Sequence, residues 1–381
     1  MKKMITKTTE ITFVPVNEPL LSGNEKKYLL ECIESGWISS EGPFVKRFER
    51  EFAARVGRRF GVAVSSGTAA LQVAVSALGI GAGDEVIMPT FTIISCAAAI
   101  MRTCASPVLI DSDPVTWNMD VSQIEAKITP KTKAIMIVHI YGLPVDVDQV
   151  IAIAKKYDLK IIEDAAQAHG LTYKSKPCGS FGDISTFSFY PNKLVTTGEG
   201  GMVVTDNEQV ACKCIGLRNL CFKKNKRFIH DELGYNFRMT NLQAALGVAQ
   251  LEQLDRFIEK KRQAGNKYTE LLSGIEQLQL PTDQITYADN IYWVYGVLLA
   301  DDFGYDADYV RKYMAHKQVG TRPFFWPIHE QPVFKKTGMF ERENYPVAEK
   351  LARRGFYLPS GLALTELQIE YVVECLKEIL K

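Results

Sequence analysis

Residues 133–167 read KAIMIVHIYGLPVDVDQVIAIAKKYDLKIIEDAAQ. The stretch opens with an apolar run of strand length at 133–139, passes through a helical pattern at 147–157 and closes on a second short apolar run at 160–163. A strand, a helix and another strand in this order predict two parallel strands of one sheet, because the helix carries the chain back to the same end. The stretch therefore predicts an α/β unit.

The same alternation continues on both sides of this unit. Further strands are expected at residues 62–65, 85–88, 107–111, 184–189 and 201–205, and a helix at 67–76. Apolar strands that alternate with helices favour a mostly parallel sheet with helices on both faces. The predicted fold class is thus α/β.

Beyond this sheet the sequence predicts a second, smaller unit. A long helical pattern over residues 241–272 can bridge two domains. It is followed by a strand at 292–299, a helix at 308–317, an extended run at 320–325 and a last helix with a capping box at Thr365 and Gln368. We expect a large domain over residues 1–250 and a small α+β domain over residues 251–381, with the first ~30 residues of the chain able to pack against the small domain.

The composition excludes several classes of partner. Lys and Arg total 45 against 44 Asp and Glu, and a net charge of +1 creates no field that would favour nucleic acid or an anionic membrane. No stretch approaches the ~20 apolar residues of a membrane span, and the first residues lack a signal-peptide core. We expect a cytoplasmic protein that binds neither nucleic acid nor membrane.

The eight cysteines are scattered along the chain and predict no disulfide framework. Their closest grouping is Cys212, Cys214 and Cys221, which lacks a paired C-x2-C spacing and a nearby histidine. We therefore predict no metal site and expect buried thiols on a helix that starts near Glu208.

Two acids, Glu163 and Asp164, come at the end of the strand at 160–163, and Gln167 follows three residues later. A buried carboxylate is costly unless a cation answers it. The protonated ring nitrogen of pyridoxal phosphate (PLP) is such a cation, and PLP needs an acid there to act as an electron sink. The alternative is an acidic helix cap without a ligand.

A lysine follows the strand at 184–189. The run SFYPNK at residues 188–193 ends on Lys193 and leads into the glycine-rich TTGEGG at 196–201. A lysine in a partly desolvated site has a lowered pKa and can form a Schiff base. Ser188 could donate to a phosphate, and the alternative for Lys193 is a solvated loop position.

Two further loops complete the set. SSGTAA at residues 65–70 joins a strand to a helix, where Ser66, Gly67 and Thr68 would offer donors at a helix N-terminus that favours phosphate. GYNFRMTN at residues 234–241, which includes Asn236, precedes the long helix in the kind of loop that often carries function. A plain helix start is the alternative for both.

The motifs SSGT, EDAAQ, SFxxNK, TGEGG and YNFRMTN together resemble the sugar aminotransferases of the DegT/DnrJ/EryC1/StrS family, and the likeness runs from Glu18 to the last helix. The resemblance implies the fold-type I scaffold of PLP enzymes. It assigns Lys193 as the lysine that binds the cofactor and moves the proton between the amino carbon and the cofactor. Asp164 would pair with the ring nitrogen and Gln167 would contact the ring oxygen.

The resemblance also implies how the rest of the cofactor is held. Gly67, Thr68 and Ser188, together with Ser66, would hold the phosphate. In the family an asparagine of the partner subunit completes this cradle, and Asn236 is the matching residue, which implies a homodimer with shared active sites.

At one position expected to cover the cofactor ring, the sequence differs from the pattern that is common in the family. PTFTIIS at residues 89–95 carries Ile93 where the family often has an aromatic that stacks on the ring. We expect Ile93 to cover the ring as an apolar wall, with Phe91 as the alternative.

The resemblance implies a ping-pong transamination in which L-glutamate supplies the amino group and a nucleotide-linked keto sugar accepts it. The likeness is strongest to members that make GDP-perosamine from GDP-4-keto-6-deoxymannose, a sugar of cell-surface polysaccharide such as the O-antigen of lipopolysaccharide. It is clearest in SGWISS at residues 35–40 and RPFFWPIH at residues 322–329. The candidate substrate contacts are Trp37, Arg322, Phe325 and His329.

Other functions stay open from the sequence. A dTDP or UDP sugar, or a ketone at C3, would change the substrate but not the reaction. A sugar dehydratase of the family would carry histidine at the position of Lys193, and a regulatory protein on the same fold would be expected to lose the lysine or the acid. An amino-acid aminotransferase would need an arginine clamp for two carboxylates, which the sequence does not locate.

Overall fold

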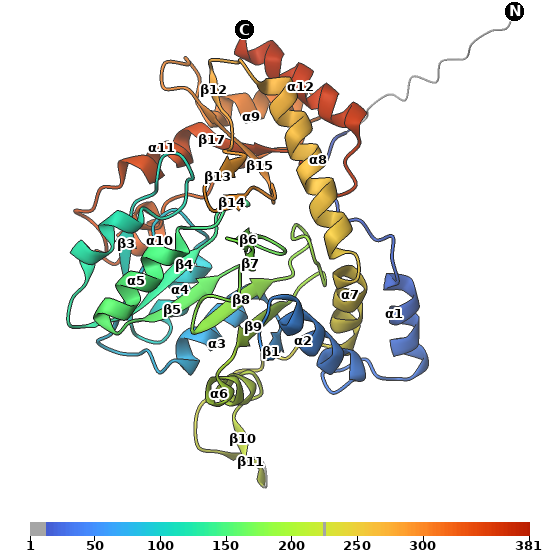
Figure 1. Cartoon of the computed structure of the whole chain (residues 1–381), viewed down its shortest axis with the longest axis vertical. Coiled ribbons are helices and arrows are strands. Elements are labelled where there is room, and N and C mark those ends of the chain that lie inside the picture. The colour runs from blue at the N-terminus through green and yellow to red at the C-terminus, as the bar shows by residue number, and fades with distance from the viewer. Residues whose placement is uncertain (1–12, 224–225) are drawn as a thin grey trace, which may run out of the picture.

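A seven-stranded sheet forms the centre of the computed structural model, which describes residues 13–223 and 226–381 (Figure 1). In spatial order its strands are β1 (Phe60–Val64), β9 (Gly201–Thr205), β8 (Ile184–Ser188), β5 (Lys160–Asp164), β4 (Thr132–Val138), β2 (Glu85–Pro89) and β3 (Ser106–Ile110). The neighbours from β8 to β3 pair in parallel, whereas β9 runs antiparallel to both β1 and β8. The predicted α/β class with a mostly parallel sheet is confirmed.

Helices connect and cover these strands. They are α2 (Pro43–Arg55), α3 (Gly67–Ala77), α4 (Ser95–Met101), α5 (Val147–Tyr157) and α6 (Glu208–Arg218). Helix α3 begins where predicted because the Ser66 hydroxyl accepts the Ala69 N–H at 3.1 Å, which satisfies a donor that the helix itself leaves unpaired. Helix α3 packs on β8 and β9, so its N-terminus lies beside the carboxyl end of β8.

The pattern over residues 241–272 forms two helices, so the prediction of one long helix is wrong. Helix α7 (Asn241–Leu251) and helix α8 (Leu254–Leu272) are separated at Glu252 and Gln253. The Glu252 carboxylate accepts hydrogen bonds from Asn24 (2.7 Å), Tyr28 (2.7 Å) and Arg47 (2.9 Å), which belong to the segments around α1 (Glu25–Glu34) and α2. These contacts hold α7 against the first helices while α8 continues toward the C-terminal part (Figure 1).

A second sheet of four antiparallel strands lies at the far end of α8. Its order is β12 (Leu278–Gln279), β15 (Tyr295–Leu299), β17 (Gly355–Leu358) and β16 (Arg322–Pro323). Its helices are α9 (Ala307–His316), α11 (Pro346–Arg354) and α12 (Glu366–Leu380), and the predicted capping box of Thr365 and Gln368 starts α12. Strand β15 begins three residues after the predicted position, and only two residues of the expected run at 320–325 pair as a strand.

In the described part of the chain, several short strands, one short helix and three 3-10 turns lie outside the two sheets and their covering helices. They are β6 (Thr172–Tyr173), β7 (Lys176–Pro177), β10 (Phe222–Lys223), β11 (Lys226–His230), β13 (Gln284–Ile285), β14 (Ala288–Asp289), α10 (Pro332–Lys335) and the 3-10 turns η1 (Val121–Gln123), η2 (Glu125–Lys127) and η3 (Ile328–Glu330). The β10–β11 hairpin projects away from the rest of the chain (Figure 1).

Two hydrophobic cores underlie the two sheets. The second core gathers side chains of α8, α9, α12 and β15 and also includes Val14. Residues from the C-terminal part, such as Trp293 and Phe324, belong instead to the first core, so the two parts pack closely. We propose a boundary between two domains near residue 250, where α7 gives way to α8.

The first described residues lie across the C-terminal part. Val14 exchanges backbone hydrogen bonds with Gln318 (2.9 Å) and Gly320 (2.8 Å), and the Ser360 N–H donates to the carbonyl of Val16 at 2.9 Å. The Asn17 amide donates to the carbonyl of Pro191 at 3.1 Å. This segment therefore joins the small sheet to the loop that precedes Lys193.

The state of the cysteines and the character of the helices can be compared with the predictions. All eight cysteines are free thiols. Helix α6 starts at Glu208 as expected, but only Cys214 is buried on it; Cys212 is exposed and Cys221 lies beyond the helix end, so the expected set of buried thiols is wrong for two of three. Among the described residues, no helix has the length and apolar character needed to cross a membrane.

Candidate active site

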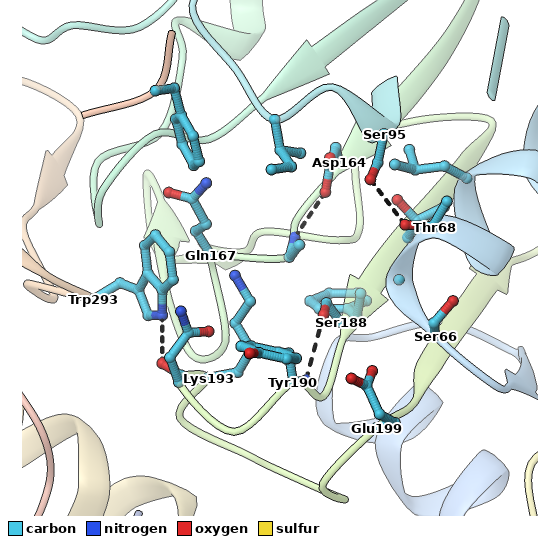
Figure 2. A pocket seen from close by; sticks show the side chains of 18 of the residues that line it. Ser66, Thr68, Ser95, Asp164, Gln167, Ser188, Tyr190, Lys193, Glu199 and Trp293 are labelled. Carbon is cyan, nitrogen blue, oxygen red and sulfur yellow. Dashed lines mark hydrogen bonds between the residues drawn. The ribbon is translucent and has the colours of Figure 1, made fainter. Parts of the chain in front are cut away.

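Four of the five predicted motifs, SSGT, EDAAQ, SFxxNK and TGEGG, meet at one cavity of about 400 Å³, at the carboxyl ends of β5 and β8 and the N-terminus of α3, whereas YNFRMTN does not reach it. Figure 2 shows Asp164, Gln167, Ser188 and Lys193 around this cavity; the first two lie at or just after the end of β5 and the last two at or just after the end of β8. Ligands of open α/β sheets bind at this end of the strands, because the connecting loops open there. The sequence spacing and the fold thus agree on the position of the site.

Lys193 extends into the cavity. Its environment lowers the lysine pKa to about 7 because the amine is desolvated, while the charge of Asp164 opposes that shift. The ammonium nitrogen lies 3.8 Å from the centre of the Trp293 ring, close enough for a cation–π contact. An amine with this pKa is about half neutral near pH 7, and its neutral form can act as a nucleophile or a base.

Asp164 is buried, with only 2% of its surface exposed, and it has few hydrogen-bond donors. It accepts the Ala166 N–H at 3.0 Å and the Cys96 thiol at 3.3 Å. Burial raises the pKa of this carboxyl, since two weak partners do not replace the lost water. A cation placed in the cavity would reverse that shift.

Glu163 has the opposite surroundings. Its carboxylate receives backbone N–H groups from Gly179 (2.5 Å), Phe181 (3.0 Å) and Gly182 (3.2 Å), the Ser185 hydroxyl (3.0 Å) and the His139 imidazole (2.9 Å). The hydrogen bonds outweigh the desolvation and lower the Glu163 pKa to about 2. The sequence suggested that both acids need a cation, and the structure assigns that need to Asp164.

Small residues shape the opposite side of the cavity. A Cβ at Gly67 would lie 2.7 Å from the Cβ of Ser188, and a Cβ at Gly201 would lie 2.3 Å from the Ser66 carbonyl oxygen. The Thr68 and Ser95 hydroxyls are 2.8 Å apart, and the Ser188 hydroxyl accepts the Tyr190 N–H at 3.4 Å. The result is a cradle of N–H and O–H groups at the start of α3, where the helix dipole favours an anion such as a phosphate.

The remaining predicted cofactor contacts lie on the cavity wall. The Gln167 amide oxygen accepts the Tyr141 N–H at 2.8 Å, which leaves its NH2 group as the donor for a ring oxygen. Ile93 lines the cavity and is 42% exposed. Phe91 is fully buried behind the wall against Tyr141 and Phe325, so it does not face the cavity.

These features fit PLP. The cradle at α3 matches its phosphate, the poorly solvated Asp164 matches its ring nitrogen, and Lys193 lies in the same cavity. The protein therefore offers an anion site, a cation site and a nucleophilic amine in the order that this cofactor needs.

Four predicted residues lie outside this cavity. Trp37 is 51% exposed and its carbonyl accepts the Asn241 amide at 2.7 Å. His329 is buried between the Thr90 hydroxyl (2.9 Å) and the Glu349 carboxylate (3.1 Å). Neither is among the described residues that line the cavity.

Arg322 and Asn236 are the other two predicted residues that lie outside the main cavity. Arg322 borders a second cavity of about 190 Å³ that shares Tyr190, Asn192 and Tyr357 with the first one. Asn236 lies at the surface, where its amide oxygen accepts the Arg238 guanidinium at 2.9 Å. Phe325, the last predicted substrate contact, does line the main cavity.

Sequence reasoning missed several wall residues. Trp293 and Tyr357 come from the C-terminal part, more than 90 residues after Lys193, and no local motif marks them. Tyr190 and Ser95 lie next to predicted residues, and their hydroxyl groups were the available signal.

Comparisons with known proteins point to one family. Residues 19–377 match the model of the DegT/DnrJ/EryC1/StrS aminotransferase family. The chain is 43% identical over 366 residues to the GDP-perosamine synthase of Escherichia coli O157:H7, which covers 96% of this chain and 98% of that protein. It is 40% identical over 364 residues to the GDP-perosamine synthase of Vibrio cholerae, with 96% and 98% covered. The structure matches the PLP form of Spr1654 from Streptococcus pneumoniae with a TM-score of 0.90 at 25% identity, over 97% of this chain and 98% of that one.

Proposed function

The chain belongs to the DegT/DnrJ/EryC1/StrS aminotransferase family, and from this premise we propose that it moves the amino group of L-glutamate to GDP-4-keto-6-deoxymannose, giving GDP-perosamine. As a member of that family it is a PLP-dependent transaminase. One observation carries the proposal: Lys193 and Asp164 face one cavity with an anion cradle at its edge. The choice of a GDP-linked 4-keto sugar is supported by the names of the relatives from E. coli and V. cholerae.

The side chains divide the work of the reaction. PLP supplies an electron sink that lets an amino group leave one carbon skeleton and join another. Lys193, with its pKa near neutrality, carries the proton at Nζ to and from the amino carbon. With the cofactor bound, the Asp164 carboxylate would stabilise a proton on its ring nitrogen, and the donors around Gly67 and Ser188 would hold its phosphate.

The second cavity supports a role for Arg322 in substrate binding. Its guanidinium donates only to the Thr321 carbonyl at 3.2 Å among the described residues, and no carboxylate pairs with it there. An unpaired arginine beside the reactive cavity suits an anionic group of a substrate. Phe325, stacked on Tyr141 with 5.4 Å between ring centres, would form the apolar side of the sugar site. Trp37 and His329 lie outside both cavities, and the proposal gives neither of them a contact with the substrate within one chain.

The proposal includes a homodimer. Asn236 lies outside the cavity of its own chain, which suits a residue that completes the phosphate cradle of a second copy. Because nucleotide-linked sugars are cytoplasmic metabolites, we place the enzyme in the cytoplasm, supplying a sugar for the O-antigen of lipopolysaccharide.

The first test is the visible absorbance spectrum of the purified protein with PLP. We expect a band that glutamate bleaches, and we expect Lys193→Ala to lose this half-reaction while its thermal unfolding midpoint stays close to that of the wild type. A band that no amino acid bleaches would contradict the transaminase mechanism. Lys260→Met, which changes a lysine on α8 away from the cavity, is the matched control.

The second test concerns the acceptor. The glutamate-treated enzyme should regain its band with GDP-4-keto-6-deoxymannose and respond far less to dTDP- or UDP-linked keto sugars. Recovery with a UDP- or dTDP-linked sugar instead would overturn the proposed substrate and leave the transamination intact.

A further inference from the structure

A second buried lysine lies outside the cavity. Lys261 on α8 is only 4% exposed, and burial alone lowers its pKa to about 7. Within the described residues no carboxylate pairs with it; its amine donates to the carbonyl oxygens of Trp293 at 2.7 Å and of Ser360. A methionine would fill the same space without desolvating an amine, so the hydrogen bonds are what the lysine adds.

Both carbonyls belong to irregular backbone. Trp293 lies just before β15, and the preceding Tyr292 has a positive φ of 48°. Helix α8 approaches this segment closely, because a Cβ at Gly265 would lie 2.3 Å from the Tyr292 ring. Outside a strand ladder, the Trp293 carbonyl depends on Lys261 for a partner, so the lysine determines where this backbone lies.

The side chain of Trp293 contacts the amine of Lys193. Its ring centre lies 3.8 Å from the Lys193 amine, and its indole N–H donates to the Asn192 carbonyl at 2.8 Å. One residue thus contacts both the tip of the Lys193 side chain and the backbone just before it (Figure 2). A shift of Trp293 would move both.

We propose that Lys261 is a positioning residue that acts through Trp293 to hold the Lys193 amine in its reactive orientation. The inference rests on the proposed glutamate half-reaction only for its kinetic readout and does not depend on which sugar is the acceptor. Its rival is a purely structural role, in which Lys261 joins α8 to the Ser360 segment and affects stability alone.

The test is a double-mutant cycle with Lys261→Met and Trp293→Phe in the PLP-loaded enzyme. We measure the rate of glutamate-driven bleaching at saturation, the glutamate concentration for half-maximal rate, and the pH midpoint of the visible band. Lys261→Met should slow bleaching about tenfold, leave the half-maximal concentration within about twofold, and shift the pH midpoint. In the Trp293→Phe background it should change the rate by less than about twofold.

The pH midpoint is informative because every variant keeps the titratable groups whose charges act on Lys193. The charge that acts on Lys193 is that of Asp164, and the nearby His169 is buried with its pKa lowered to about 3, so it is neutral near pH 7. Because Lys261→Met also removes an amine with a pKa of about 7, its midpoint is compared with that of Lys261→Arg, which keeps the cation, and a change in both variants reports on the position of Trp293.

Two results would overturn the proposal: an equal rate loss from Lys261→Met in both backgrounds, or a slower rate with no change of pH midpoint. Lys260→Met on the same helix is the control and should behave as the wild type. If Lys261→Met does not yield folded enzyme, Lys261→Arg, which keeps a cation and its donors but displaces them, is judged by the same criterion. A failure of glutamate to bleach the wild-type band would count against the proposed function, and the pH midpoint would still test the link between Lys261 and Trp293.

Discussion

Glu163 and Asp164 are neighbours on β5, yet their side chains lie in contrasting surroundings. Glu163 points into a turn of the protein and receives five hydrogen bonds, whereas Asp164 faces the cavity with two. Burial is the same for both, but the pKa of Glu163 is lowered and that of Asp164 is raised. A buried charge that the protein satisfies itself is part of the fold, and one that it leaves unsatisfied marks a place for a ligand.

The two lysines around Trp293 repeat this contrast with the opposite charge. Lys261 donates to two carbonyls, while Lys193 has only the face of an aromatic ring and the distant charge of Asp164. Both have a pKa lowered to about 7. A shifted pKa therefore does not separate the lysine that faces the cavity from the one buried beneath Trp293, whereas the number of hydrogen-bond partners does.

The largest effect should come from Asp164→Asn. Because the amide cannot hold a proton on the ring nitrogen, the glutamate half-reaction should slow by about 10²–10³-fold. The thermal unfolding midpoint should stay equal or rise, since a neutral amide costs less to bury than a poorly solvated carboxylate. A large loss of stability with normal turnover would contradict the contrast drawn between Glu163 and Asp164, because Asp164 would then be the acid that stabilises the fold.

The uptake of PLP should follow the protonation of Lys193. The neutral amine is the nucleophile, so the association rate should rise about tenfold per pH unit below pH 7 and level off above the pKa of about 7. An ordinary lysine, with a pKa of 10.5, would keep rising through that range. Stopped-flow absorbance of cofactor-free protein mixed with PLP between about pH 5.5 and 9 checks this. A rate that continues to rise at the upper end would show that Lys193 is not desolvated.

The cradle at α3 should tolerate no added methyl group. Gly67→Ala would place a Cβ 2.7 Å from that of Ser188, at the point where the phosphate donors converge, and should weaken PLP binding about tenfold, or ~1.4 kcal/mol. Gly304→Ala is the matched control, because a Cβ there meets no atom within 4 Å. Equilibrium dialysis against PLP measures both. Equal affinities in the two variants would show that the cradle does not bind the phosphate.

Glu163→Gln should have the smallest effect on turnover and a clear one on stability. The amide cannot accept all five hydrogen bonds, and the orphaned donors should cost about 1–3 kcal/mol, while the folded enzyme keeps its half-reaction rate within about twofold. The Glu163 pKa is lowered from 4.5 to about 2, so its stabilisation is complete above pH 4.5 and is lost as the pH falls toward 2. The stability gap between wild type and variant should therefore narrow over that range in denaturant titrations. A pH-independent gap would contradict the assignment of a buried carboxylate.

The parts of this site that the sequence predicted are those carried by single loops. Lys193, Asp164 and Gly67 each follow or precede a strand whose apolar run is readable, so their positions at one end of the sheet could be inferred. Residues whose placement depends on distant packing could not. Trp293 lies on an irregular segment that contacts α8 through the hydrogen bond from Lys261 to its carbonyl, and no local motif marks this placement.

The fold shows the same limit. The strands of the large sheet lie within two residues of their predicted bounds, since burial on both faces makes each a clear apolar run. The break at Glu252 was not predicted, because both helices continue one apolar spacing and the break is held by Asn24, Tyr28 and Arg47, more than 200 residues away. Phe91 was offered as a ring cover on its position in a motif, and only packing shows that it lies behind the wall.

The contacts of the first described residues have a consequence for synthesis on the ribosome. Val14 and Val16 pair with Gln318, Gly320 and Ser360, and Asn17 reaches the loop before Lys193. At the 5–20 residues per second typical of translation, this opening segment waits on the order of tens of seconds for its partners to emerge. The large sheet can assemble early on the nascent chain, but the loop before Lys193 is joined to the small sheet through this segment only after Ser360 has been synthesised.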